Sequence, residues 1–301
     1  MNRLTSLSLL AAALLPASIP SAALAQTAAQ PAAQVGGLEE YFDNYWQMVA
    51  TAKSEQPDWS SPVITTTALL EERARFDTQF QHAGNNTDTI NLDGGKGVNF
   101  IVAPTEELQV QLPPYVVRTA PKASSEVYGW NDWTPLRFKQ RLLSSPEDAG
   151  NYVVSAWLNV GVPVGVSKLT NHAVTLQPTL GFGKGWGPFD IQGTVGWIIP
   201  VTYEGKLGEQ FQGNLAFQYH VLHYFWPQLE VNYTEYPNGQ RAGLNQVFLT
   251  PGLVVGRFPL TKDLKLTVGV GYQVAVAPSY RAKPLTPSYD RAWVLTTRVS
   301  F

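Results

Sequence analysis

The last eleven residues, Arg291-Ala-Trp-Val-Leu-Thr-Thr-Arg-Val-Ser-Phe301, alternate strictly between two faces. One face carries Trp293, Leu295, Thr297, Val299 and Phe301, and the other carries Val294, Thr296, Arg298 and Ser300. Alternation with a period of two predicts a strand that is buried on one side. About ten residues is also the length with which a tilted strand crosses a bilayer. A soluble protein can end in such a strand too, so the rest of the chain has to decide between the two readings.

The same alternation runs through most of the chain from about residue 68 onward. Between residues 264 and 274, for example, Leu, Val and Tyr occupy the even positions and Lys, Thr, Gly and Gln the odd ones. Roughly a dozen runs of this kind follow one another, and antiparallel membrane barrels have an even number of strands. The sequence therefore predicts an all-β fold, a closed antiparallel transmembrane β-barrel of about twelve strands with a short N-terminal helix.

The lengths of the connecting segments support a barrel that crosses a membrane. Membrane barrels join their strands by short turns at the periplasmic end and longer loops at the outer end. The expected long connections lie at 82–96, 119–132, 163–172, 201–209, 237–244 and 277–290. The expected short ones lie at 103–106, 145–150, 184–187, 222–226 and 257–262. A soluble sandwich has no reason to keep this rhythm, so it favours the barrel.

The polar faces of the predicted strands are rich in Gln, Asn, Thr, Ser and Gly. A soluble β-sandwich turns its polar face to solvent, where Lys and Glu are common, but only 15% of this chain is charged. Small neutral polar residues suit the inside of a barrel whose outside faces lipid. Aromatic residues gather near predicted strand ends, for example Trp186 and Phe189, as in interfacial girdles. Pro178 and Pro251 fall inside predicted strands, and we expect a local bulge at each.

The N-terminus has the pattern of a secretory signal peptide, residues 1–25. A short basic start is followed by an apolar core, and Ala23-Leu24-Ala25 matches a cleavage site. Residues 26–62 form a lead-in that contains an amphipathic helix at about 38–53, because apolar residues recur there at helical spacing. The helix can dock on the barrel rim, enter the lumen as a plug or lie on the membrane. Residues 63–301 form the predicted barrel, which places the protein in a Gram-negative outer membrane.

Composition excludes several kinds of site. The chain has no Cys, so it has neither disulfides nor Cys-ligated metal. A net charge of −2 gives no reason to expect nucleic acid as a partner. The sequence contains no cofactor or metal motif, and we expect neither.

Two short motifs and the terminal residue resemble known outer-membrane proteins. The terminal Phe301 resembles the last residue of outer-membrane barrels, which the barrel assembly machinery reads. The stretch Gly129-Trp-Asn-Asp132-Trp-Thr-Pro-Leu-Arg-Phe-Lys139-Gln-Arg-Leu142 resembles a Gly-x-x-Asp…Lys strand of the MetA-pathway of phenol degradation family. Val160-Gly-Val-Pro163-Val-Gly165 resembles the Pro-x-Gly strand end of that family, a set of outer-membrane channels. The resemblance covers roughly 68–301 and implies a barrel that admits small, often hydrophobic or aromatic, solutes. The predicted membrane barrel also has outer-membrane lipid as a partner.

Charged residues on the predicted inner faces are few and clustered. Arg137, Lys139 and Arg141 share one face of one strand. Glu71, Arg73, Arg75 and Asp77 share a face of the first strand, and Arg298 on the last strand neighbours it if the barrel closes. Such a cluster can form a charged constriction that selects solutes. It can equally be an internal ion-pair network that stiffens a narrow barrel, and the sequence leaves both open.

Catalysis is not expected. The four His residues are His82 and His172 in loops, His220 on the inner register and His223 in a short turn. No outward-facing Ser shares a register with an outward His, and no Gly-x-Ser-x-Gly is present. The predicted function is passive passage of a small solute, with Arg137, Lys139 and Arg141 shaping selectivity. The alternatives are a sealed structural or adhesive barrel that binds partners through its loops and, as a weaker one, a membrane-embedded lipase.

Overall fold

The computed structural model describes residues 37–94, 96–202, 207–277 and 289–301. The predicted signal peptide lies outside the described residues. The chain divides into two compact units, and the contacts given below lie within the second, Trp46–Phe301. The predicted helix is confirmed as α1 (Leu38–Ser54), with Glu39 and Glu40 in its first turn and Lys53 in its last. These charges complement the helix dipole. No described helix is long and apolar enough to cross a membrane.

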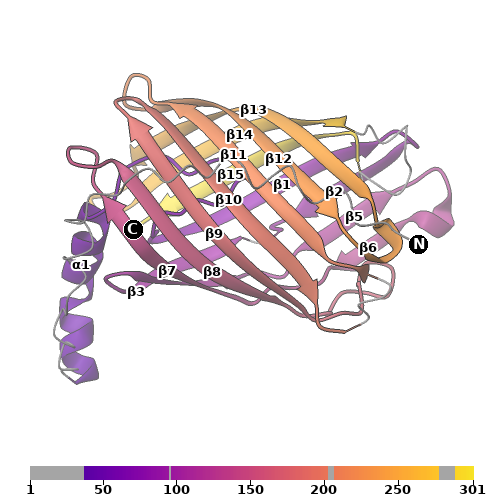
Figure 1. The fold of residues 1–301 in the computed structure, drawn as a ribbon, viewed down its shortest axis with the longest axis horizontal. Helices are drawn as coiled ribbons and strands as arrows, with labels where there is room; N and C mark the ends of the chain where they lie inside the picture. The colour runs from indigo at the N-terminus through magenta and orange to yellow at the C-terminus, as the bar shows by residue number, and fades with distance from the viewer. Residues whose placement is uncertain (1–36, 95, 203–206, 278–288) are drawn as a thin grey trace, which may run out of the picture. The chain divides into compact units, whose positions relative to one another are not determined.

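Fifteen strands form one antiparallel sheet, which closes because the last strand pairs with the first (Figure 1). The strands are β1 (Arg73–Ala83), β2 (Thr87–Leu92), β3 (Gly97–Ala103), β4 (Glu106–Gln111), β5 (Tyr115–Thr119), β6 (Val127–Trp130), β7 (Leu136–Ser145), β8 (Tyr152–Gly161), β9 (Thr175–Trp186), β10 (Phe189–Pro200), β11 (Gln210–Tyr219), β12 (Phe225–Tyr236), β13 (Leu244–Pro259), β14 (Lys265–Ala277) and β15 (Arg291–Ser300). Within the described residues, the short 3-10 helices η3 (Ala123–Ser125) and η4 (Gly239–Arg241) lie in connections. At the closure Arg75 stands opposite Arg298, so the predicted neighbourhood of the first and last strands is confirmed.

The fifteen strands make twelve passages of the barrel wall, because three passages are each broken into two strands. β1 pairs with β2 along its outer half and with β3 at its start, so β2 and β3 form one passage. In the next passage β5 pairs with β2 and β4 pairs with β3. In the passage after that, β6 pairs with β5 and β7 pairs with β4. The predicted twelve-stranded closed barrel is therefore confirmed.

Two predicted long loops are wrong because each contains a strand. The stretch 119–132 contains β6, so only residues 120–126 join β5 to β6. The stretch 82–96 was expected to be a long connection, but β2 lies within it and only residues 84–86 join β1 to β2. The alternation in this passage is interrupted between Leu92 and Gly97, and the strand resumes beyond the break. A short polar strand next to such a break carries too few alternating residues to be recognised by its period. The later connections keep the predicted alternation of long and short, from 162–174 and 187–188 onward.

The three breaks lie side by side and are bridged by hydrogen bonds. Leu112 N–H donates to the carbonyl of Lys96 at 2.9 Å, and Gln111 N–H donates to that of Pro135 at 2.9 Å. Pro113, Pro114 and Pro135 stand in or beside these breaks and have no N–H to continue a ladder. Proline thus accounts for two of the three breaks, whereas the break between Leu92 and Gly97 contains none.

The two faces of the wall are as predicted. On β15 the outward Trp293 and Leu295 are 53% and 46% exposed, whereas the inward Thr296 and Arg298 are both 2% exposed. Aromatic pairs lie near strand ends, such as Trp186 with Phe189 at 6.3 Å between ring centres. An exposed apolar outer face with aromatic ends is what a lipid-embedded barrel requires.

The strand prolines do not produce the expected bulges. Pro178 stands opposite Leu158 in an unbroken ladder with β8, while the β9–β10 ladder is interrupted between Thr179 and Leu176 without a change of register. The β13–β14 ladder is likewise interrupted beside Pro251 without a change of register. Each proline therefore removes ladder pairs on one side and keeps the register, so no extra residue is inserted.

The inner segment, residues 55–72, runs inside the barrel between α1 and β1. Most of its side chains are buried, and it packs in two apolar clusters. The first contains Trp59, Ala68, Leu69 and the wall residue Val153. The second contains Val63 and the wall residues Trp226, Val254 and Val294. The lumen is thus occupied by the stretch that follows the helix.

Candidate functional site

One end of the barrel carries the short connections, such as 187–188, which are periplasmic in outer-membrane barrels. This periplasmic half holds many buried polar contacts. Two wall carboxylates accept hydrogen bonds from the main chain of the inner segment. Glu230 on β12 accepts the N–H groups of Ile64 at 2.8 Å and Thr65 at 2.6 Å. Glu107 on β4 accepts the N–H group of Glu71 at 2.7 Å. Both carboxylates are fully buried.

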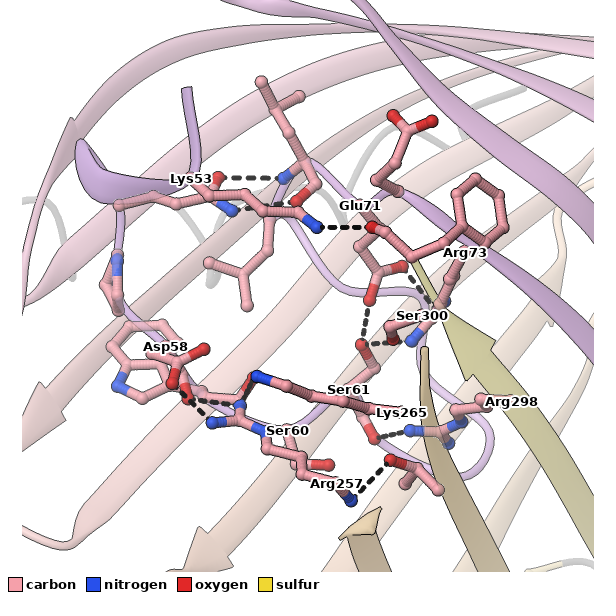
Figure 2. Close-up of a pocket in the computed structure, with 18 of the residues that line it drawn as sticks. Lys53, Asp58, Ser60, Ser61, Glu71, Arg73, Arg257, Lys265, Arg298 and Ser300 are labelled. Carbon is pink, nitrogen blue, oxygen red and sulfur yellow. Dashed lines mark hydrogen bonds and ion pairs between the residues drawn. The ribbon is translucent and has the colours of Figure 1, made fainter. Parts of the chain in front are cut away.

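Wall cations donate to carbonyl groups of the inner segment. Arg298 donates to the carbonyls of Ser61 at 2.5 Å and Pro62 at 2.7 Å, and Figure 2 shows its guanidinium directed at this stretch. Lys139 donates to the carbonyl of Leu69 at 2.8 Å. Charged hydrogen bonds are among the strongest in proteins, so these side chains fix the course of the segment.

Neutral side chains and α1 complete this set of contacts. Gln192 donates to the carbonyl of Ser60 at 2.8 Å and Ser155 to that of Ala68 at 2.5 Å. Arg141 donates to the carbonyl of Ala52, at the end of α1, at 2.6 Å. The inner segment therefore has partners on several sides of the barrel.

The predicted charged residues form ion pairs within this region. Glu71 pairs with Arg73 at 2.5 Å, Arg75 with Asp77 at 2.8 Å and Lys139 with Glu107 at 3.1 Å. Arg137, Lys139 and Arg141 are 9%, 1% and 4% exposed, so none of them lies on a free surface. Lys139 and Arg141 bond to Leu69 and Gln56 of the inner segment. Arg137 donates to Asn159 at 2.8 Å. The structure thus brings the two predicted charge clusters together.

Two groups of the segment and helix outside the strands have shifted pKa values. Burial lowers the pKa of Lys53, although Glu72 and Glu71 oppose the shift. Burial alone would raise the pKa of Glu71, but Arg73 and Lys139 outweigh it and lower that pKa. Both effects follow from placing ionisable groups among opposite charges in a low dielectric.

Glycines on the inner face make room for the inner segment. A Cβ at Gly183 would meet the ring of Trp59, and a Cβ at Gly271 would lie 3.3 Å from a methyl of Val63. These positions allow the apolar side chains of the segment to reach the wall backbone. This accounts for part of the glycine on the polar faces of the sequence.

A cavity of about 270 Å³ lies between the inner segment and the ends of the last strands (Figure 2). Its lining carries both signs of charge, including Lys53, Glu71, Arg73 and Arg298. At its edge Arg257 bonds the carboxylate of Asp58 and donates to the carbonyl of Trp59 at 3.2 Å. Arg257 therefore holds the inner segment at the point where it enters the barrel.

Toward the outer end, the inner wall carries neutral amides bonded to one another. Asn159 donates to Gln177 at 3.0 Å, and Gln177 donates to Gln212 at 2.9 Å. Asn232 donates to Asn214 at 2.9 Å. The sequence predicts these residues only as members of a polar face. No local pattern predicts the hydrogen bonds that join them along the wall.

Two predicted site residues lie at the rim. His220 follows the end of β11, is exposed and stacks on Trp226 with 4.5 Å between ring centres. Phe301 donates its N–H to the carbonyl of Glu72 at 3.2 Å and accepts from Lys53 at 3.1 Å. Among the described residues no group of three His, Asp or Glu is placed to hold a metal ion.

The two motifs of the family resemblance meet in space. Asp132 accepts the N–H of Gly165 at 3.2 Å and that of Asn171 at 2.7 Å. A Cβ at Gly129 would meet Val166 at 2.7 Å. The Gly-x-x-Asp and Pro-x-Gly stretches therefore form one contact near the outer end of the barrel.

Comparison with known proteins gives the fold. No family model and no curated protein sequence matches the chain. Among solved structures it is similar to the COG4313 outer membrane channel from Pseudomonas putida F1, with a TM-score of 0.51 and 14% identity over 80% of this chain and 98% of that one. It is also similar to the NanC porin, with a TM-score of 0.48 and 8% identity over 76% of this chain and 98% of that one. The chain therefore has the fold of Gram-negative outer-membrane proteins, a closed, porin-like β-barrel of twelve strands.

Proposed function

We propose that the protein is an outer-membrane channel that passes small solutes by passive diffusion and that the inner segment controls its periplasmic end. The observation that carries this proposal is the inner segment itself, which fills one half of a lumen whose other half is lined by neutral amides. A barrel that served only as an anchor would need no such lining. Movement of a short segment is also sufficient to open a narrow lumen.

In this proposal Lys139 and Arg141 act through the inner segment, and Arg137, which shares their strand face and donates to Asn159, adds to charge selectivity. Lys139 and Arg141 donate to main-chain carbonyls at 2.8 and 2.6 Å, and both are almost fully buried. A passing solute meets them only when the segment has moved. We therefore assign them an anchoring role while the segment is in place and a role in charge selectivity once it has left.

The solute class follows from the resemblance to the MetA-pathway of phenol degradation family. That resemblance suggests small hydrophobic or aromatic compounds as the solutes. The contact between Asp132 and Gly165 supports it, because both motifs that carry the resemblance lie in one place. Amides at the wall add donors and acceptors for any polar group that such a compound carries.

A reversible lock tests the proposed control. Val63 and Val254 both lie within 3.3 Å of the point where a Cβ at Gly269 would stand, so they are neighbours. We expect the full-length variant V63C/V254C to show low single-channel conductance in a planar bilayer when oxidised. Conductance should rise to the parent level on reduction, while the single variants stay constant in both conditions. Equal conductance of the oxidised and reduced forms contradicts control by the inner segment.

The many hydrogen bonds that hold the inner segment in the lumen favour a second candidate function. In this function the barrel is sealed and binds partners through its outer loops. In that case neither the parent protein nor reduced V63C/V254C conducts, although heat-modifiable mobility on a gel shows that both are folded. Swelling of liposomes in small neutral solutes separates the two candidates, because only a channel admits the solute.

A further inference from the structure

The wall holds the inner segment mainly through peptide groups. Glu230 accepts two consecutive N–H groups, and Arg75 donates to the carbonyl of Val63 at 2.5 Å. In contrast, the buried Thr65 hydroxyl and the Trp59 indole N–H have no hydrogen-bond partner among the described residues. The wall therefore recognises the course of a main chain more than the polar side chains that it carries.

The recognising groups come from strands around the whole barrel and are held by other wall residues. Their positions are Arg75 on β1, Glu107 on β4, Lys139 on β7, Gln192 on β10, Glu230 on β12 and Arg298 on β15. Asp77 fixes Arg75, Gln228 donates to Glu230 at 2.7 Å and Gln218 accepts from Gln192 at 2.9 Å. Because the wall orients these groups itself, the site is preorganised, which lowers the cost of binding.

Some side chains of the segment also contact the wall: Thr67 donates to Gln192 at 2.7 Å, and Glu72 accepts the N–H of Ile101 at 2.7 Å. Two apolar clusters add to these contacts. Val63 packs against Trp226, Val254 and Val294. Trp59 and Leu69 pack against Val153. The segment folds back on itself, because Gln56 donates to the carbonyl of Leu70 at 2.8 Å and Trp59 lies in one cluster with Leu69. The wall thus binds a looped main chain that is anchored by two apolar clusters.

We propose that the periplasmic half of the lumen is a binding site for a looped polypeptide, which residues 59–72 occupy in cis. The same stretch supplied as a separate chain binds there in exchange for the tethered one. The proposal goes beyond solute passage and concerns binding alone, so a protein that conducts nothing still tests it.

Disulfide capture on the full-length protein tests the exchange. The chain has no Cys, so V254C supplies a single reactive thiol. The probe is a synthetic peptide of residues 57–72 carrying V63C, added under a mild thiol-exchange buffer. We expect a mixed disulfide, seen as a mass increase, that unmodified peptide competes away. The matched control is T234C, which places the thiol on the same strand face as Glu230 but toward the outer end.

Altered peptides test recognition of the main chain. Because the Thr65 hydroxyl is unpartnered and its N–H is bound by Glu230, T65A in the peptide should leave the capture rate within about twofold. N-methylation at Thr65 removes a hydrogen bond to a buried carboxylate and should slow capture at least about tenfold. Equal capture of native and scrambled peptides, or of native and N-methylated peptides, overturns the proposal.

The double variant V63C/V254C tests whether the two positions can form a disulfide. It should close its own disulfide under the same conditions. If it closes while V254C captures no peptide, the segment does not exchange and the proposal is overturned. Capture that is equal at V254C and T234C overturns it as well, because the reaction is then not tied to the site.

Discussion

Lys139 is a single buried residue on which two partners depend. It pairs with the fully buried Glu107 and donates to the carbonyl of Leu69, and it is 1% exposed. We expect K139M to lower the free energy of unfolding by about 3–5 kcal/mol, because the carboxylate is left buried without its cation. Urea unfolding in lipid vesicles, followed by Trp fluorescence, measures this loss.

The matched control for K139M is K262M, which removes a cation from an exposed turn. We expect that control to change stability by less than about 0.5 kcal/mol. The double variant K139M/E107Q should recover part of the loss, since it removes the uncompensated charge. Equal stability of K139M and K262M would show that the ion pair holds nothing in place.

Gly183 is a second residue with a defined steric role. A Cβ there would meet the ring of Trp59, so G183A should displace the first apolar cluster and weaken the hold on the inner segment by about 1–3 kcal/mol. Limited proteolysis of residues 55–72 in the folded barrel should be faster. G213A serves as control, because its Cβ would contact only Phe211, at 3.9 Å. Identical cleavage of the two variants argues against the contact.

At the scale of the element, the inner segment is held by charge and should respond to pH. The pKa of Glu71 is lowered below its ordinary value of 4.5 by Arg73 and Lys139, against the effect of burial. A carboxyl group whose pKa is lowered in the folded state stabilises that state at pH values above its ordinary pKa. This stabilisation is lost as the pH falls from the ordinary pKa through the lowered one. Acidification below about pH 4.5 should therefore release the segment, seen as faster proteolysis with an acid-stable protease and as higher conductance.

The variant E71Q isolates this contribution. It cannot ionise, so at neutral pH its segment should be looser than in the parent protein. Its response to acid should also be shallower, because one of the groups that titrate has been removed. Coincident pH profiles for E71Q and the parent would mean that Glu71 does not contribute to holding the segment.

At the scale of the whole molecule, the barrel wall is continuous without the inner segment. β1 begins at Arg73 and pairs with β15 over its full length, so every ladder lies outside residues 26–70. We expect a variant lacking these residues to remain a heat-modifiable barrel and to conduct more than the parent in planar bilayers. Loss of heat modifiability would show instead that the segment is part of the core required for folding.

The alternation in the sequence alone predicted most of the strands of the barrel wall. Strict alternation in stretches such as 264–274 and 291–301 assigned side chains to the inner and outer faces, because the faces of a strand follow directly from its period of two. The same logic picked out Arg137, Lys139 and Arg141 as inward cations. It failed where the period is interrupted, at the break between Leu92 and Gly97 that hid β2.

The occupant of the lumen was decided only by the tertiary structure. Residues 55–72 carry no period that marks a strand or helix, and their partners Glu107, Gln192 and Arg298 lie far along the chain. Their hydrogen bonds involve peptide groups, which every sequence has, so no local sequence pattern predicts these bonds. Periodic side chains determined the barrel, and closure of the barrel determined what it encloses, because only closure brings distant inward groups around one segment.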